Sequence, residues 1–237
     1  MASNGLTNAH SNRVASRDYI RWDAEGVEKI PPNEQEDIQA VAEMINKIQR
    51  AQFNSHRHMY SGTHARTQGV VKGNLIVGDL LLHLARSLFS KPAEYPIAMR
   101  YSTEPGDPGL GIKILASSRP ALDLADAKTT KEIINLCIKY GGDKKELYKH
   151  LEARNDTPLQ KARDEVRNTH LSSTRQYSQA AYRYGNYVVK YYLVPSSGTQ
   201  KKQYEETVKS DSHPDDILSE WLKEFHANHD AKYLFQV

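Results

Sequence analysis

Residues 63–73 read THARTQGVVKG. The stretch from 67 to 77 is rich in β-branched side chains, which favour a strand, and it contains Gly69 and Gly73. Glycine inside a strand is typical of a bulge or of a close approach between two backbones. We therefore expect a bent strand or hairpin here.

Residues 96–103 read PIAMRYST and alternate between apolar and polar side chains. Side chains on a strand alternate between two faces, so Arg100 and Ser102 share one face while Ile97 and Tyr101 share the other. This pattern predicts a second strand, and residues 111–115 predict a third, shorter one.

Helical periodicity is found outside these strands. Apolar residues recur every three or four positions at Ile38, Val41, Met44, Ile45 and Ile48, behind acidic residues that suit the first turn of a helix. Further helices are expected at 79–89, in pieces across 125–168, and after Pro214, and further strands at 175–195 and 232–237. Because strands and helices are segregated along the chain, the sequence predicts an α+β fold with an antiparallel sheet.

Length and composition indicate a single domain. Of the 237 residues, 1–25 are polar and aperiodic and are expected to form a disordered tail, and 26–237 the folded domain. The net charge of +3 results from 32 basic and 29 acidic residues, too small an excess to propose nucleic acid as a partner. No apolar run is long enough to cross a membrane.

Two residue types carry further information. The single cysteine, Cys137, cannot form an internal disulfide, which favours a reducing compartment and a cytoplasmic location. It lies among isoleucines, which predicts a buried thiol. The 14 tyrosines against 4 phenylalanines predict a core or pocket with polar edges, because a buried tyrosine hydroxyl needs a hydrogen-bond partner.

Residues that can carry chemistry gather in the first two strands. His64 opens the glycine-bent strand and could project into a cavity, although a surface or structural histidine has the same pattern. On the next strand, Arg100 could pair with a carboxylate and Ser102 could orient a histidine. A solvated polar face of an edge strand is the alternative for these two residues.

A metal site is a further hypothesis. His56 and His58 are two residues apart, which places them on the same side of an extended segment, and His64 follows. Imidazoles are common ligands of transition metals. A solvated, partly buried pair of histidines explains the same spacing.

The order of these segments resembles the haem-dependent catalase superfamily, most closely its smaller catalase-related branch found in fungi and bacteria. The resemblance covers residues 30–237. It is carried by THARTQGVVKG at 63–73, YPIAMRYSTEPGD at 95–107, LGIKI at 110–114, SQAAYRYGNYVVK at 178–190 and YLFQV at 233–237. Taken together in this order, the segments are far more specific than any one of them.

The resemblance implies an antiparallel β-barrel surrounded by helices, with haem as the cofactor. It implies catalytic roles for His64, as the distal acid–base, and for Ser102, which would hydrogen-bond that imidazole. Arg100 and Arg66 would bind the cofactor, Arg100 through a haem propionate. The expected function is a haem-dependent oxidoreductase that acts on hydrogen peroxide or uses an oxidant on a small organic substrate.

The chain departs from the pattern of the family in ways that support an alternative. The connection before Leu110 is shortened, and the strand expected after Ile114 is missing. The sequence ends at Val237, before the region that carries the proximal ligand in the family. The alternative is a non-catalytic catalase-like protein that binds a small molecule or a partner. An incomplete barrel leaves strand edges to cover, so a homo-oligomer is expected.

Overall fold

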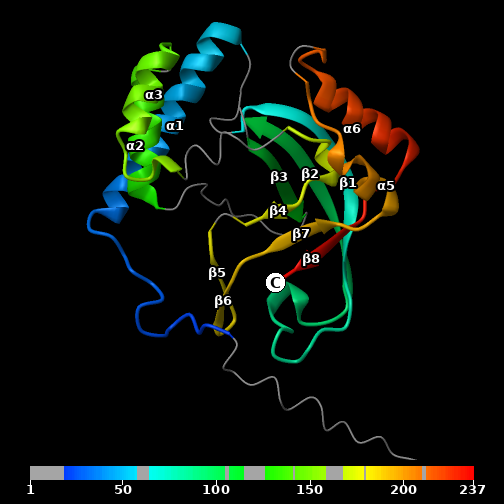
Figure 1. The fold of residues 1–237 in the computed structure, drawn as a ribbon. Coiled ribbons are helices and arrows are strands. Elements are labelled where there is room, and N and C mark those ends of the chain that lie inside the picture. The colour runs from blue at the N-terminus through cyan, green and yellow to red at the C-terminus, as the bar shows by residue number, and fades with distance from the viewer. Residues whose placement is uncertain are drawn as a thin grey trace, which may run out of the picture.

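The computed structural model describes residues 19–57, 64–104, 107–114, 126–140, 142–158, 168–178, 180–209 and 212–237. Within these residues the fold is α+β, with helices and small antiparallel sheets (Figure 1). This confirms the predicted fold class at that level.

Three helices pack against one another, apart from the main sheet (Figure 1). They are α1 (Glu34–His56), α2 (Ala127–Tyr140) and α3 (Lys144–Glu152). Val41 is buried as the periodicity of α1 predicts, and Asp37 is buried where it forms an ion pair with Lys131 of α2. The side chain of Cys137 on α2 is exposed, so the predicted buried thiol is wrong, because the buried face of α2 lies at Ala127, Thr130 and Ile133.

The main sheet has the order β1-β2-β3. Its strands are β1 (Arg66–Val77), β2 (Ala93–Glu104) and β3 (Asp107–Ile114), all antiparallel, which confirms the three predicted strands. The register shifts between Thr67 and Gly69, so the bulge expected at a glycine is present. The alternation on β2 is also confirmed, since Ile97, Met99 and Tyr101 are all buried.

The remaining strands are short. β4 (Gln176–Tyr177), β7 (Tyr192–Pro195) and β8 (Tyr233–Gln236) form a second sheet in the order β4-β7-β8, and β5 (Tyr182–Tyr184) pairs with β6 (Tyr187–Val189). Among the described residues the strands do not close into one barrel, and the catalase-like barrel is not confirmed. The predicted strand region 175–195 is divided because Gly185, with φ 61°, turns the chain between β5 and β6.

Helix α6 (Ile217–Asn228) lies beside β1 (Figure 1). It begins after Pro214, as predicted, and buries Leu218, Leu222 and Phe225, which are four and three residues apart. Leu218 and Leu222 form a core cluster with Tyr101 and Leu171, the latter from the short helix η2 (Leu171–Ser173). The core thus lies between the sheet and α6.

Gly69→Ala is expected to lower the free energy of unfolding by about 1–3 kcal/mol. A Cβ at this position would lie 2.7 Å from Leu222 Cδ2, and Leu222 is itself held in the core. The matched control is Gly73→Ala on the same strand, where the nearest heavy atom would be 3.9 Å away. Urea unfolding of both variants checks the prediction, and equal stabilities would contradict it.

The predicted helix at 79–89 is wrong. The segment contains turns and only a short 3-10 helix, η1 (Ser87–Phe89), and Ser87 has a left-handed φ of 48°. Two carbonyls of the segment accept hydrogen bonds from tyrosine side chains: Leu84 O from Tyr184 Oη at 2.5 Å, and Leu88 O from Tyr95 Oη at 3.1 Å. The Leu84 carbonyl, which a helix would bond to the N–H of Leu88, is thus taken by a tertiary hydrogen bond.

The predicted tail, residues 1–25, lies mostly outside the described residues. Where it is described, it lies against the β5–β6 hairpin: Trp22 N donates to Asn186 O at 3.1 Å, and Val188 N donates to Ile20 O at 2.9 Å. The Arg183 guanidinium also lies 3.8 Å from the Trp22 ring centroid. Among the helices described here, none is both long and apolar enough to cross a membrane.

Candidate functional site

The side chain of Arg100 contacts the backbone of His64 at the start of β1. His64 directly precedes β1, is half-buried and has a φ of 45°. Arg100 Nη2 donates to the His64 carbonyl oxygen at 2.6 Å, and Arg100 Nε donates to Thr67 Oγ1 at 2.8 Å. The guanidinium therefore ties the start of β1 to β2.

Ser102 belongs to the same face of β2 as Arg100. Its cross-strand partner is Thr67, and the residue is 3% exposed. The structure thus brings three of the predicted site residues, His64, Arg100 and Ser102, to one end of the β1–β2 pair. The roles that the resemblance implies for them stay predictions.

Arg66 lies on the other face of the sheet. It pairs with Thr103, which is two residues from Tyr101 on the face that meets α6. Its Nη2 donates to the carbonyl oxygen of Asp215, just before that helix. Arg66 is on β1 and Arg100 is on β2, and their side chains lie on opposite faces of the sheet. The sheet therefore separates the two arginines that were predicted to bind one cofactor.

A cavity of about 310 Å³ opens beside Arg66. Its lining residues come from β1, β2, position 168, position 208 and residues 213–218: Arg66, Gln68, Thr103, Asn168, Val208, His213, Pro214, Asp215, Ile217 and Leu218. Hydrogen bonds link part of its wall to α6, since Gln68 Nε2 donates to Thr103 Oγ1 at 2.8 Å and Ser219 Oγ donates to Gln68 Oε1 at 2.6 Å. Four elements thus converge on one concave, half-polar space.

The hydrogen bonding of two polar side chains of this cavity, His213 and Asn168, can be described. Lys209 N donates to His213 Nδ1 at 3.0 Å, which makes Nε2 the nitrogen that carries the hydrogen in the neutral ring. Asn168 Oδ1 is buried and has no hydrogen-bond partner among the described residues. A buried acceptor without a partner costs about 1–3 kcal/mol.

A buried polar network is centred on His170. His170 is 2% exposed, hydrogen-bonds Ser172 Oγ through Nδ1 at 2.8 Å, and stacks parallel to Trp221 with centroids 5.8 Å apart. Burial lowers the pKa of His170 to about 4. The ring is therefore neutral at neutral pH.

Two tyrosines continue this network. Tyr233 Oη donates to Ser172 O at 2.9 Å, and Tyr101 Oη lies 2.9 Å from Tyr233 Oη. Because Tyr233 has one hydroxyl hydrogen, Tyr101 donates to Tyr233. Burial raises the pKa of both hydroxyls. The polar-edged core expected from the tyrosine count is confirmed, whereas His170, which has no sequence motif around it, was not predicted.

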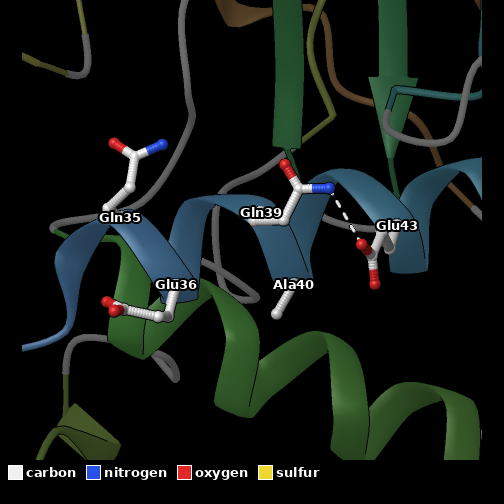
Figure 2. A pocket seen from close by; sticks show the side chains of 5 residues that line it. All are labelled: Gln35, Glu36, Gln39, Ala40 and Glu43. Atoms are coloured by element: carbon white, nitrogen blue, oxygen red, sulfur yellow. Dashed lines mark hydrogen bonds between the residues drawn. The ribbon is translucent and has the colours of Figure 1, made fainter.

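A shallower depression of about 370 Å³ lies on α1 (Figure 2). Its lining residues all come from one helix: Gln35, Glu36, Gln39, Ala40 and Glu43. Gln39 Nε2 is hydrogen-bonded to Glu43 Oε1 at 2.8 Å. With a single element forming its wall, the depression offers no convergent groups, and the Arg66 cavity is the better candidate.

No cluster of three or more metal-ligating side chains occurs within the described residues. The hypothesis of a site at His56, His58 and His64 falls outside them, because His58 and the side chain of His56 are not described. It stays a prediction.

Comparison with known proteins adds no relative. The chain matches no protein-family model, no curated protein and no solved structure. The resemblance to the catalase superfamily therefore rests on the sequence segments alone.

Proposed function

We propose that this chain binds a small organic molecule in the cavity beside Arg66, as a catalase-like protein that does not need haem for this function. The supporting observation is the convergence of β1, β2, the start of α6 and the segments at 168 and 213–215 on one space beside Arg66. Ligand pockets combine apolar walls with placed polar groups, and this cavity has both, with a larger polar share than most.

A haem-dependent oxidoreductase is the competing proposal. The contact between Arg100 and the backbone of His64 favours it, because the resemblance places both residues over one cofactor. However, the guanidinium groups of Arg100 and Arg66 both bind protein oxygens, and they lie on opposite faces of the sheet. In this arrangement the described residues do not fit haem in the way that the resemblance implies.

A nuclear magnetic resonance titration tests the proposed cavity. Acetamide and acetate, added separately in the millimolar range to ¹⁵N-labelled protein, are expected to shift the amides of residues that line the cavity. Arg66→Gln removes the guanidinium, so it should abolish the shifts caused by acetate, whereas Lys72→Gln, at an exposed position of the same strand, should leave them unchanged. The absence of shifts with both probes would contradict the proposal.

A haem titration separates the two functions. If the protein does not use haem, added haem should give no stoichiometric Soret band, and Arg100→Ala should change the stability of the protein without changing its absorption spectrum. A stoichiometric Soret band that changes in His64→Ala would favour the oxidoreductase. A cytoplasmic location is part of the same proposal and rests on the single cysteine.

A further inference from the structure

We infer that the ligand of the Arg66 cavity is a monocarboxylate with a short apolar body. This inference rests on the proposed function, and it names the class of molecule that the cavity takes. Its basis is the hydrogen bonding of the wall, where side-chain acceptors are already bound and donors remain, together with an apolar side.

Gln68 and Thr103 show this pattern in the buried part of the wall, where each is 7% exposed. Gln68 Oε1 accepts from Ser219 Oγ at 2.6 Å, and Gln68 Nε2 donates to Thr103 Oγ1 at 2.8 Å. An amide nitrogen has two hydrogens and a hydroxyl has one. The second hydrogen of Gln68 Nε2 and the hydroxyl hydrogen of Thr103 therefore have no acceptor among the described residues, and both suit an oxygen of a ligand.

Arg66 and His213 add donors to the same wall. Arg66 has five N–H donors and gives one hydrogen bond within the described residues, from Nη2 to the backbone oxygen of Asp215. Because this oxygen is uncharged, the positive charge of the guanidinium is left for a ligand, and arginine binds a carboxylate in a bidentate manner. His213 accepts at Nδ1 from Lys209 N, so its Nε2 carries a hydrogen. The wall thus suits an anionic acceptor.

Two further lining residues carry oxygens, but neither provides an acceptor for a cationic ligand. Asn168 Oδ1 has no partner in the part of the chain that is described, yet it is buried, so a molecule in the cavity does not reach it. Asp215 is an exposed residue, and the atom that contacts Arg66 is its backbone oxygen. The contacts that are described therefore favour an acid over an amine.

Charge and size narrow the class further. Arg66 is the only permanent cation among the described lining residues, so it balances one negative charge, and the second charge of a dicarboxylate or a phosphate would have no partner in the wall. A volume of about 310 Å³ is at the low end of ligand pockets, which suits a body of a few carbons. Val208 and Ile217, which pack against the core cluster, form with Leu218 an apolar surface for this body.

Isothermal titration calorimetry with three probes tests the inference. 4-Methylpentanoate has the carboxylate and the apolar body, 4-methylpentanamide has the same skeleton without the charge, and acetate has the carboxylate without the body. We expect 4-methylpentanoate to bind at least about tenfold more tightly than either of the others. The amide lacks the charged hydrogen bonds to Arg66, and acetate lacks the apolar area.

Arg66→Gln tests the contact with the carboxylate. It should weaken the binding of 4-methylpentanoate at least about tenfold and change the binding of the amide by less than about twofold. Lys72→Gln is the matched control, at an exposed position of the same strand, and should change neither affinity.

Val208→Thr tests the apolar side. The substitution keeps the shape of the side chain and adds a hydroxyl, so it should weaken the binding of 4-methylpentanoate about three- to tenfold and leave acetate unchanged. Val70→Thr is the matched control, because Val70 is 63% exposed on β1 and does not line the cavity.

The outcomes are distinguishable from failure of the cavity itself. Acetamide shifts at the lining residues, combined with equal affinities for 4-methylpentanoate and its amide, would overturn the monocarboxylate inference and keep the binding cavity. Equal affinities of the Arg66→Gln and Lys72→Gln proteins for 4-methylpentanoate would also overturn it. Should Arg66→Gln fail to fold, the three probes on the parent protein and the Val208 and Val70 pair decide. Silence of all probes would end both proposals.

Discussion

Gln200→Ala is expected to lower the free energy of unfolding by about 3–5 kcal/mol. Gln200 belongs to α5 (Gly198–Lys202) and is 0% exposed. Its Nε2 donates to Ser172 O at 2.7 Å, and its Oε1 accepts from Lys232 N at 3.0 Å and from Ser197 N at 3.2 Å. One side chain thus satisfies three backbone groups, and its removal leaves them without that partner.

The same helix end supplies a matched control. Gln203, in η3 (Gln203–Glu205), has an Oε1 that is buried and has no hydrogen-bond partner among the described residues. Gln203→Ala removes this unsatisfied acceptor, so it should leave the free energy of unfolding unchanged or raise it. Chemical denaturation of both variants measures the difference, and a Gln200→Ala variant as stable as Gln203→Ala would contradict the bridging role.

His170 is expected to make the protein lose stability as the pH falls from 6.5 to about 4. Burial lowers its pKa from the ordinary value of 6.5 to about 4, so in this window the unfolded chain takes up a proton that the folded chain refuses. The stability that depends on a neutral His170 ring is fully present above pH 6.5 and is lost at about pH 4. It amounts to roughly 3 kcal/mol over the window.

His170→Asn isolates this contribution. Asparagine can still hydrogen-bond Ser172 but does not titrate. Urea unfolding between pH 7.5 and 4 should show that the pH-dependent loss is smaller in the variant than in the parent by roughly 3 kcal/mol. Burial also lowers the pKa of His226, which is why some loss remains. Parallel pH profiles of parent and variant would contradict the assignment.

Much of the secondary structure follows from local pattern. The period of two at 96–103 and the glycines of 67–77 predicted strands that are present, with the bulge at Gly69. The apolar period after Pro214 predicted α6. These patterns work because each reflects one buried face of one element, which neighbouring residues specify among themselves.

Segment 79–89 shows where local pattern fails. Its leucines have helical spacing, yet Leu82 is 87% exposed, and tyrosines from β5 and β2 bind the carbonyls at positions 84 and 88. The hydroxyls come from residues that are seven and one hundred positions away. A periodicity argument does not include such partners, so tertiary contacts override the propensity.

The candidate site, too, was predicted only in part from the sequence. Period two on β2 was sufficient to group Arg100 with Ser102, and strand pairing added His64. The sequence pattern could not show that Arg66 lies on the opposite face of the sheet from Arg100. The bulge between Thr67 and Gly69 changes the register at that point. Nor could the pattern show that Asn168 and Asp215 would share one cavity.

Local order along the chain was enough to establish the class of the fold, the two main strands, the helix after Pro214 and the need for partners of the many tyrosine hydroxyls. Only the packed chain decided which hydroxyls meet, which arginine contacts the residue just before α6, and where the cavity beside Arg66 forms. The physical reason is distance in sequence: Arg66, Asn168 and Asp215 are 47 to 149 positions apart, and the core between β1 and α6 brings them together.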